Sequence, residues 1–164
     1  MNTRRLSWLS LFVALSVIGG MIKVPAVVSS VALDSFPALL AAGLMGAGPG
    51  ALVAGMGHLV SALVGGMPLG PFHVLIAVEM AAILWLFAKL YQTRNKLIAV
   101  GVFIFLNSAV APAPFILFFG AEFYVGLVPA VFLASFMNGV LAWIALPRLM
   151  PIFQKFDQSF EVKV

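Results

Sequence analysis

The sequence predicts an all-α integral membrane protein, a compact bundle of six transmembrane helices with both termini in the cytoplasm. Hydrophobic residues make up 63% of the 164 residues and charged residues only 9%, whereas soluble domains contain about 25% charged residues. Mean hydropathy is +1.17. The basic residues stand between apolar runs, as topology signals do. This placement favours a membrane protein, with no nucleic acid as partner, despite the net charge of +4.

The N-terminal part of the chain contains one full-length span and one short helix. Residues 6–22 form an apolar run close to the length of about 20 residues that crosses the hydrocarbon core. Residues 23–33 are β-branched and interrupted by Pro25, so we expect an ordered outer loop lying over the bundle. Asp34 or Ser35 can cap a second helix over residues 35–46, with Pro37 in its first turn. This helix is short for a full span.

Glycine, proline and polar residues separate the remaining four helices. Gly48-Pro49-Gly50 predicts the turn before the third helix. An irregular outer loop is expected at 65–71, a polar inner loop at 92–96 and an outer hairpin at 115–124. The predicted helices cover residues 50–64, 72–91, 97–110 and 125–146, followed by a short amphipathic cytoplasmic tail at 147–164. We expect residues 1–164 to form a single membrane domain.

The distribution of basic residues supports six spans. With six spans, only Lys23 faces outward, and the other basic residues face the cytoplasm: Arg4, Arg5, Lys89, Arg94, Lys96, Arg148, Lys155 and Lys163. This asymmetry agrees with the positive-inside rule, and five spans would largely remove it. The pair Arg4-Arg5 also allows a secretory or twin-arginine signal, but no cleavage site is evident after Gly20. We therefore interpret these arginines as a cytoplasmic anchor of the first helix.

Ionisable residues in the apolar segment 43–80 are the first candidates for a binding site. An ionisable side chain at bilayer depth costs about 3 kcal/mol on insertion scales and indicates function. Glu79 is a candidate hydrogen-bond acceptor or proton site, and His58 lies at a similar depth, so the two side chains can pair. His73 stands at the membrane boundary. The alternative for each residue is a structural polar group that fixes helix packing.

Four further residues complete the predicted substrate-binding set. Asp34 and Lys23 flank the outer loop and can cap, pair or close over a ligand. Asn107 lies in the outer half of the fifth helix and either bridges helices or meets the substrate. Phe72 belongs to an outer aromatic group that forms an interface belt or stacks on a ring-shaped ligand.

The sequence contains no recognisable catalytic apparatus. Two histidines and one glutamate lack the spacing of a metal motif such as HExxH, and the chain has no cysteine. No metal and no cofactor are therefore predicted. A GxxxxGK[ST] loop is also absent from the sequence, so the chain has no visible means of hydrolysing ATP. We expect a protein that is not an enzyme.

Small residues recur at four-residue spacing on the first and third helices. The stripes are Ser10-xxx-Ala14, Ser16-xxx-Gly20, Gly50-xxx-Ala54-xxx-His58 and Gly57-xxx-Ser61-xxx-Gly65. Such spacing allows helix backbones to approach closely within a membrane. The stripes predict internal packing, and several together also suggest a face for another membrane subunit.

Taken together, these features resemble the substrate-binding S component of an energy-coupling factor (ECF) vitamin transporter. The resemblance rests on the six-span layout, the opening RLSWLSLFVALSVIGGMIKVP and the block SFPALLAAGLMGAGPGALVAGMGHLVSALVGG. It implies a vitamin or vitamin precursor bound from outside, transport driven by a membrane T subunit with two cytoplasmic ATPases, and a bacterial plasma-membrane location. The segment GHLVSALVGGMPLGPFHVLIAVEM looks like the branch associated with α-ribazole, a cobalamin precursor.

The resemblance also implies a contact surface for the T subunit. Members of the family carry an A-xxx-A type motif on the first helix, for which Ser10-xxx-Ala14 is the nearest match, although the serine departs from the pattern. We add Gly50 and Ala54 of the third helix to this predicted surface. The alternative function is an autonomous proton-coupled carrier or intramembrane enzyme that uses Glu79 and His58.

Overall fold

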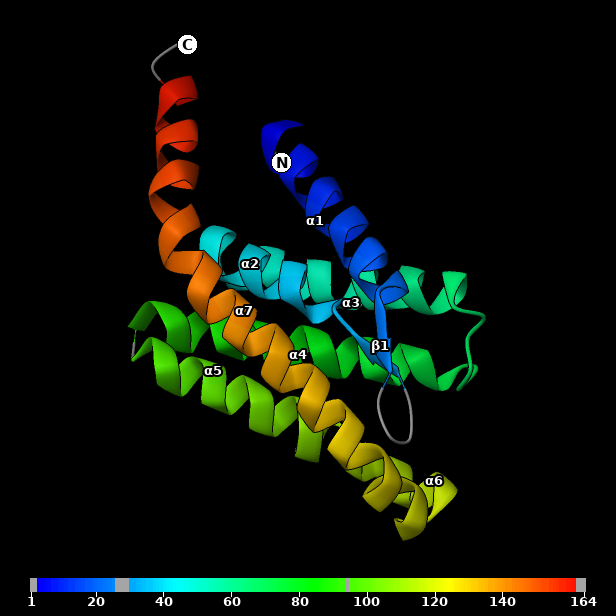
Figure 1. Cartoon of the computed structure of the whole chain (residues 1–164). Coiled ribbons are helices and arrows are strands. Elements are labelled where there is room, and N and C mark those ends of the chain that lie inside the picture. Colours follow the sequence, from blue (N-terminus) through cyan, green and yellow to red (C-terminus); the bar gives the residue numbers. More distant parts are fainter. Residues whose placement is uncertain (1–2, 26–29, 94, 162–164) are drawn as a thin grey trace.

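The computed structural model describes residues 3–25, 30–93 and 95–161. The main helices are α1 (Thr3–Met21), α2 (Ser35–Met45), α3 (Ala47–Val64), α4 (Phe72–Thr93), α5 (Lys96–Phe105) and α7 (Ala121–Glu161). Three short helical segments join α5 to α7: η1 (Leu106–Val110), η2 (Ala113–Phe115) and α6 (Ile116–Phe119). The first turn of α1 and the last turns of α7 lie at the same end of the molecule (Figure 1).

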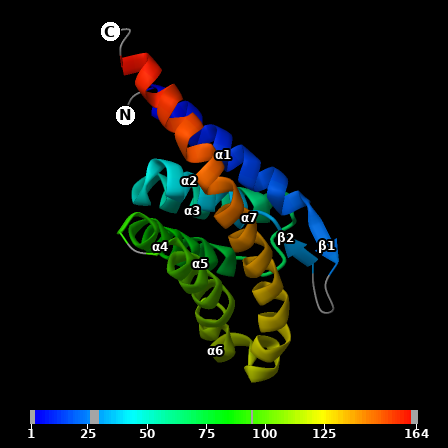
Figure 2. The ribbon, with the colours of Figure 1, turned by 60° about the vertical axis from the view of Figure 1, so that its left-hand side comes forward.

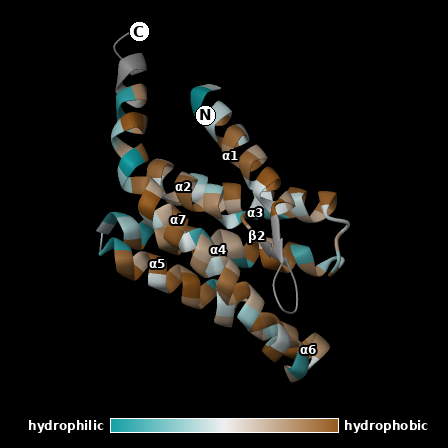
Figure 3. Cartoon of the chain, in the orientation of Figure 1, coloured by the Kyte–Doolittle hydropathy of each residue, from teal (hydrophilic) through white to brown (hydrophobic). Residues whose placement is uncertain are grey.

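The six main helices confirm the predicted all-α fold class. Four helical segments are long and apolar enough to cross a membrane: Ala47–Val64, Phe72–Thr93, Lys96–Phe119 and Ala121–Phe156. Hydrophilic residues gather at the start of α1, at the connection of α4 to α5 and toward the end of α7 (Figure 3). The remaining two helices are α1, which begins beside the charged pair Arg4 and Arg5, and the short α2.

Helix α2 is short because it is the centre of the bundle. It has 11 residues, about half of the hydrocarbon thickness at a rise of about 1.5 Å per residue. Most of its side chains are buried on every side, including Ala38, Leu39 and Ala41, and it packs against α1, α3, α4 and α7. A helix that is hydrophobic all round is a core helix. Because α2 is surrounded by other helices, it does not have to span the full thickness of the bilayer.

The predicted turn at Gly48-Pro49-Gly50 is wrong. The chain turns at Gly46, whose φ of 95° suits glycine, and α3 begins at Ala47. Pro49 stands in the first turn of α3, where backbone N–H groups have no helical partner and a proline costs little. Gly50 instead allows α3 to approach α2, because an added Cβ would come within 2.4 Å of the Ala42 Cβ.

Two of the small-residue stripes pack against each other between α1 and α3. A Cβ added at Gly57 would lie 2.6 Å from the Ser16 Cβ, and one added at Gly20 would lie 1.9 Å from the Ser61 Oγ. Ser16 is almost fully buried at this crossing. The stripes Ser16-xxx-Gly20 and Gly57-xxx-Ser61 thus mediate internal packing, which is the first of the two predicted uses.

The expected outer loop contains a small hairpin, β1 (Lys23–Pro25) and β2 (Ser30–Ala32). The strands are antiparallel, with Lys23 opposite Ala32 and Pro25 opposite Ser30. The last residue of β2 and the residue after it are attached to two helices. The Leu33 N–H donates to the Gly19 carbonyl at 3.0 Å, and Asn138 Nδ2 donates to the Ala32 carbonyl at 2.9 Å. The end of the hairpin is therefore held between α1 and α7.

The C-terminal half departs from prediction in two places. Residues 115–124 do not form a hairpin: the chain stays helical through η2 and α6, turns at Gly120 with a φ of 85°, and begins α7 at Ala121. The predicted helix end at Leu146 is also wrong, because α7 continues to Glu161 through Pro129, Pro147 and Pro151. The cytoplasmic position of residues 147–164 stays a prediction. Proline is tolerated in membrane helices when surrounding groups satisfy the freed carbonyls.

Contacts with α1 hold the last part of α7 in place. The rings of Trp8 and Phe153 have centroids 5.2 Å apart, and the Arg4 guanidinium donates to the Phe156 carbonyl. Figure 2 shows the two helices projecting together from the bundle. The C-terminal extension of α7 is therefore packed against the rest of the protein. The sequence prediction, which ended this helix before Pro147, did not include that packing.

Candidate substrate-binding site

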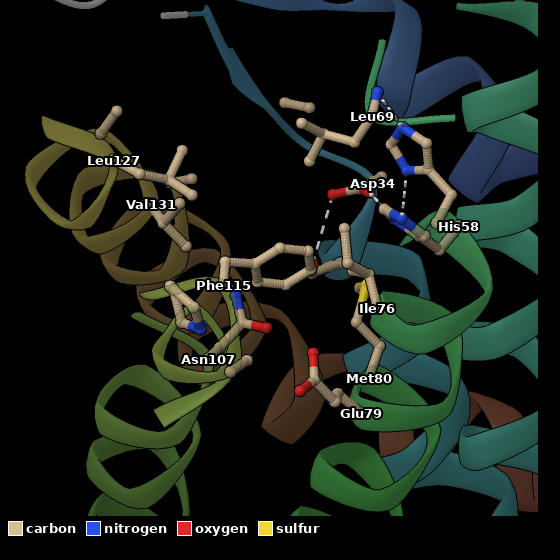
Figure 4. A pocket seen from close by; sticks show the side chains of 17 residues that line it. Asp34, His58, Leu69, Ile76, Glu79, Met80, Asn107, Phe115, Leu127 and Val131 are labelled. Carbon is tan, nitrogen blue, oxygen red and sulfur yellow. Dashed lines mark hydrogen bonds and ion pairs between the residues drawn. The ribbon is translucent and has the colours of Figure 1, made fainter. Parts of the chain in front are cut away.

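A cavity of about 310 Å³ lies between the start of α2, α3, α4, η1 and α7 (Figure 4). Its wall is predominantly apolar, with a few polar side chains. The lining residues are Ala32, Asp34, Ser35, His58, Leu69, His73, Ile76, Glu79, Met80, Asn107, Ala111, Pro112, Phe115, Leu127, Ala130, Val131 and Ala134. A concave apolar site with a small number of polar groups is typical of small-molecule binding sites.

Helical periodicity explains how two elements contribute to the wall. On α7, Leu127, Ala130, Val131 and Ala134 follow the i, i+3, i+4, i+7 spacing of one helix face. On α4, His73, Ile76 and Met80 do the same, and Glu79 borders them. His73 and Glu79 therefore line one cavity although their side chains leave α4 in different directions.

His58 and His73 form a polar contact that the sequence did not predict. The Nε2 atom of His58 lies 3.1 Å from Nδ1 of His73, and the Leu69 N–H donates to His73 Nε2 at 3.3 Å. On its other side, His58 Nδ1 lies 3.6 Å from Asp34 Oδ2. The predicted pairing of His58 with Glu79 is thus replaced by contacts to His73 and Asp34.

Glu79 is the polar side chain of the cavity with the fewest interactions. Its Oε2 atom is buried and accepts no hydrogen bond from any residue that the structure describes. In Figure 4 its carboxylate points into the space between Met80 and Asn107. A buried carboxylate oxygen without a partner is energetically costly. The arrangement suits a ligand that brings a hydrogen-bond donor.

Asn107 reaches the cavity from an irregular helical turn. It lies in η1, a π-helical turn in which the Ala111 N–H donates to the Leu106 carbonyl at 2.8 Å. Turns of this kind occur frequently at functional sites. The Asn107 Nδ2 atom donates to Ser135 Oγ at 2.8 Å, and Ser135 Oγ donates to the Val131 carbonyl at 2.7 Å. The amide oxygen of Asn107 therefore remains an acceptor for a ligand.

Five of the seven predicted substrate-binding residues lie on this cavity: Asp34, His58, His73, Glu79 and Asn107. Phe72 is not a lining residue. Its ring packs instead against Phe115, with ring centroids 5.7 Å apart, and against Phe118 and Phe119. Phe72 thus supports Phe115, which does line the cavity. The side chain of Lys23 lies outside the described part of the structure.

Sequence reasoning did not find the contribution of α7. Its four lining residues are apolar and carry no chemical signal, although the spacing of small residues in 127–134 was available in the sequence. Leu69, Ile76 and Met80 were missed for the same reason, and Ser35 was interpreted only as a helix cap. Such apolar residues define the shape of a site. Only the packing of the helices shows which face of each helix lines the cavity.

Two of the four residues predicted to contact the T subunit are exposed, and their contact with that subunit stays a prediction. Ser10 and Ala14 are exposed on α1. Gly50 and Ala54 are buried, and Gly50 packs against α2. Since buried residues cannot contact another subunit without disrupting the bundle, we withdraw Gly50 and Ala54 from that surface.

Charge sets a further limit on the ligand. The cavity wall carries the carboxylates of Asp34 and Glu79, and none of the lining residues that the structure describes is lysine or arginine. Across the described residues, no group of three or more His, Asp or Glu side chains is arranged to hold a metal ion. The charged side chains on the described cavity wall are therefore both carboxylates, which are hydrogen-bond acceptors when ionised.

The fold and the cavity define a membrane-embedded substrate-binding protein, and comparison with known proteins is consistent with this class. The family model for the substrate-specific component of ECF transporters matches residues 4–160. The chain therefore belongs to this family of multi-pass plasma-membrane proteins, which bind small molecules and work with T and ATPase subunits. The family is a transport component and not an enzyme.

A solved structure has the same fold. It is the S component of a bacterial ECF transporter, with a TM-score of 0.74 and 20% sequence identity, over 93% of this chain and 98% of that chain. No curated protein matches the chain. The structural similarity concerns the fold, so the substrate must be inferred from the cavity itself.

Proposed function

We propose that this protein is the substrate-capture subunit of an ECF importer for α-ribazole, a neutral vitamin precursor. The observation that carries the proposal is the balance of polar groups on the cavity wall. Two carboxylates and the amide oxygen of Asn107 are available as hydrogen-bond acceptors for a ligand, while the described lining residues include no lysine or arginine. This set favours a neutral or cationic ligand that brings donors, and disfavours vitamins that carry a carboxylate or phosphate.

The chemistry of α-ribazole matches both parts of the wall. Its dimethylbenzimidazole is a flat apolar bicycle, and its ribose supplies three hydroxyl donors. The apolar surface to which Phe115, Ile76 and the α7 face contribute suits the bicycle. Asp34, Glu79 and Asn107 suit the hydroxyls. Cationic thiamine is the runner-up within the same class, because it also lacks an anionic group.

Transport requires partner subunits in this proposal. The exposed residues Ser10 and Ala14 on α1 form the contact with the T subunit, which in turn carries two ATPases. Exposed apolar neighbours such as Leu11 and Leu15 extend this face. An Ala14→Trp variant should bind substrate normally but fail to copurify with the T subunit. A Trp at Val78, exposed on α4, is the matched control.

The test is ligand binding by the purified protein in detergent. We expect a saturable thermal shift with α-ribazole, a smaller or absent shift with thiamine, and none with biotin or pantothenate, which carry carboxylates. A response to the carboxylate vitamins would contradict the charge argument. Uptake into liposomes without ATPases would instead favour an autonomous carrier that uses Glu79 and His58.

A further inference from the structure

Hydrogen bonds connect the backbone of Leu69 to the wall of the cavity through two histidines. The Leu69 N–H donates to His73 Nε2 at 3.3 Å, and His73 Nδ1 lies 3.1 Å from His58 Nε2. The next atom along the chain, His58 Nδ1, faces Asp34 (Figure 4). A neutral imidazole has one donor and one acceptor nitrogen, so each of these bonds restricts the position of the next proton.

Only one arrangement of protons satisfies all of these contacts. The Leu69 N–H needs a bare His73 Nε2, so the single proton of neutral His73 is on Nδ1. That proton points to His58 Nε2, which must then also be bare. The proton of His58 is consequently on Nδ1. An additional proton on either ring would break at least one of the two hydrogen bonds, so the contacts hold both rings in the neutral Nδ1–H form.

The chain ends in a donor without a hydrogen-bond partner. His58 Nδ1 is buried and makes no hydrogen bond to any described residue, and its distance of 3.6 Å to Asp34 Oδ2 exceeds hydrogen-bonding range. The other carboxylate oxygen, Asp34 Oδ1, accepts from Ser35 Oγ at 3.3 Å. His58 and Asp34, which both line the cavity, therefore place a donor, His58 Nδ1–H, beside an acceptor, Asp34 Oδ2.

We propose that His58 and Asp34 together bind one hydroxyl group of the ribose of α-ribazole. A hydroxyl accepts from His58 Nδ1–H and donates to Asp34 Oδ2 at the same time. A carbonyl, a carboxylate or an ammonium group can satisfy only one of the two. His73 is a positioning residue in this arrangement, because its bond to His58 fixes the proton on Nδ1. The inference rests on the proposed function and adds which group of the ligand is recognised and how.

The first arm of the test reads the protons directly in the ligand-free protein. The chain has only two histidines, so ¹⁵N NMR of histidine-labelled protein, with one variant for assignment, resolves both rings. We expect two neutral rings with the proton on Nδ1, the opposite of the Nε2–H form that histidine favours in water. An Nε2–H form or an imidazolium at neutral pH for either ring would overturn the proposal.

The second arm measures affinity for α-ribazole and its three monodeoxy analogues. For one analogue, wild-type protein should lose about 10- to 100-fold in affinity, the size expected for a hydrogen bond to a charged group. His58→Leu removes the donor but leaves Asp34 Oδ2 as an acceptor, so it should lower that preference by about 3- to 10-fold and leave the affinity for that analogue itself nearly unchanged. Val74→Ala, at an exposed position of α4 beside His73, is the control and should retain the full preference.

The positioning effect of His73 has its own test. His73→Leu should lower the hydroxyl preference by about 3- to 10-fold, since it frees the tautomer of His58. In a His58→Asn background the side-chain amide nitrogen replaces Nδ1 as the donor. An amide nitrogen is a donor whether or not His73 is present. There, His73→Leu should leave the preference unchanged.

The outcomes separate this inference from the proposed function. If wild-type protein does not bind α-ribazole, the substrate assignment and the inference fall together. If it binds and His58→Leu lowers the affinity for all four compounds equally, the substrate assignment stands and the hydroxyl-binding pair is wrong. A loss confined to one deoxy analogue, together with both Nδ1–H rings, supports the proposal.

Discussion

Among the single residues of the cavity, Glu79 has the least support from the protein. His58, His73 and Asn107 each make a hydrogen bond to another described residue, whereas Glu79 Oε2 is buried and accepts none. Burying a charged or polar group without a partner costs free energy that folding does not return. Buried polar groups that have no hydrogen-bond partner within the protein are expected mainly at functional sites. We therefore expect donors on the ligand to satisfy Glu79.

Replacing Glu79 should separate binding from folding. Glu79→Gln removes the charge and keeps one acceptor oxygen, so we expect the affinity for α-ribazole to fall by about 10- to 100-fold, because bonds to charged groups contribute about 1.5–3 kcal/mol. The melting temperature without ligand should not fall, since a desolvated charge is removed. Isothermal titration calorimetry and thermal unfolding measure the two quantities. Glu122→Gln, exposed at the start of α7, should change neither, and equal affinities for wild type and Glu79→Gln would refute the assignment.

At the scale of elements, small residues determine how closely α1, α2 and α3 approach. Gly57 leaves room for Ser16, and Gly50 leaves room for Ala42. Lipid offers no hydrophobic drive for helix association, so close backbone contact supplies the packing energy instead. The central α2 depends on these contacts because it is too short to be held by the bilayer.

Substitution of a packed glycine should destabilise the bundle. Gly57→Ala places a Cβ 2.6 Å from the Ser16 Cβ, and overpacking of this kind costs about 1–3 kcal/mol. Gly101→Ala on α5 is the matched control, because a Cβ added there meets nothing within 4 Å and alanine is favoured in helices by up to about 1 kcal/mol. Titration with sodium dodecyl sulfate in bicelles gives the free energies of unfolding. Equal stability of the two variants would exclude close α1–α3 packing.

The attachment of β2 to α7 gives a second prediction at this scale. Asn138 is almost fully buried, and its Nδ2 donates to the carbonyls of Ala32 and Ala134. Asn138→Ala should free the end of the hairpin and speed hydrogen exchange in residues 30–33, with a loss of about 1–3 kcal/mol in local stability. Hydrogen-exchange mass spectrometry measures this. Exchange in α3, which is not packed against α7, should stay unchanged, and protection of 30–33 as in wild type would contradict the attachment.

At the scale of the whole molecule, orientation in the membrane follows from charge. The ends of α1 and α7 lie on one side (Figure 1), and the basic residues near them, such as Arg5 and Lys155, predict that this side is cytoplasmic. The connection of α4 to α5, with Lys96, belongs to the same side in this prediction. The start of α7 at Glu122 is then on the outer face.

The absence of cysteine makes this orientation simple to measure. Single substitutions Glu122→Cys, Thr93→Cys and Lys155→Cys lie at exposed positions. In intact cells a membrane-impermeant maleimide should label Glu122→Cys alone, and the other two only after permeabilisation. Labelling of Lys155→Cys from outside would reverse the topology or require a different number of spans.

The sequence by itself determined the class of the protein and identified several of the polar residues that line the cavity. Composition and the spacing of basic residues predicted an all-α membrane protein, and the start of α2 at Ser35 and of α4 at Phe72 followed from local signals. Ionisable residues in apolar helices, Glu79 and His58 above all, indicated the cavity. The predictions of class and of helix starts succeeded because hydropathy and local helix signals belong to a segment by itself. That Glu79 and His58 bind the substrate stays a prediction.

Tertiary structure alone decided the partners of those residues. The bond between His58 and His73, the free oxygen of Glu79 and the burial of Gly50 depend on which helices are neighbours and how each is rotated. The helical continuation of α7 through Pro147 likewise requires surrounding contacts, such as that of Phe153 with Trp8. Such pairings join residues far apart in the chain, so neither propensity nor periodicity in a single segment encodes them.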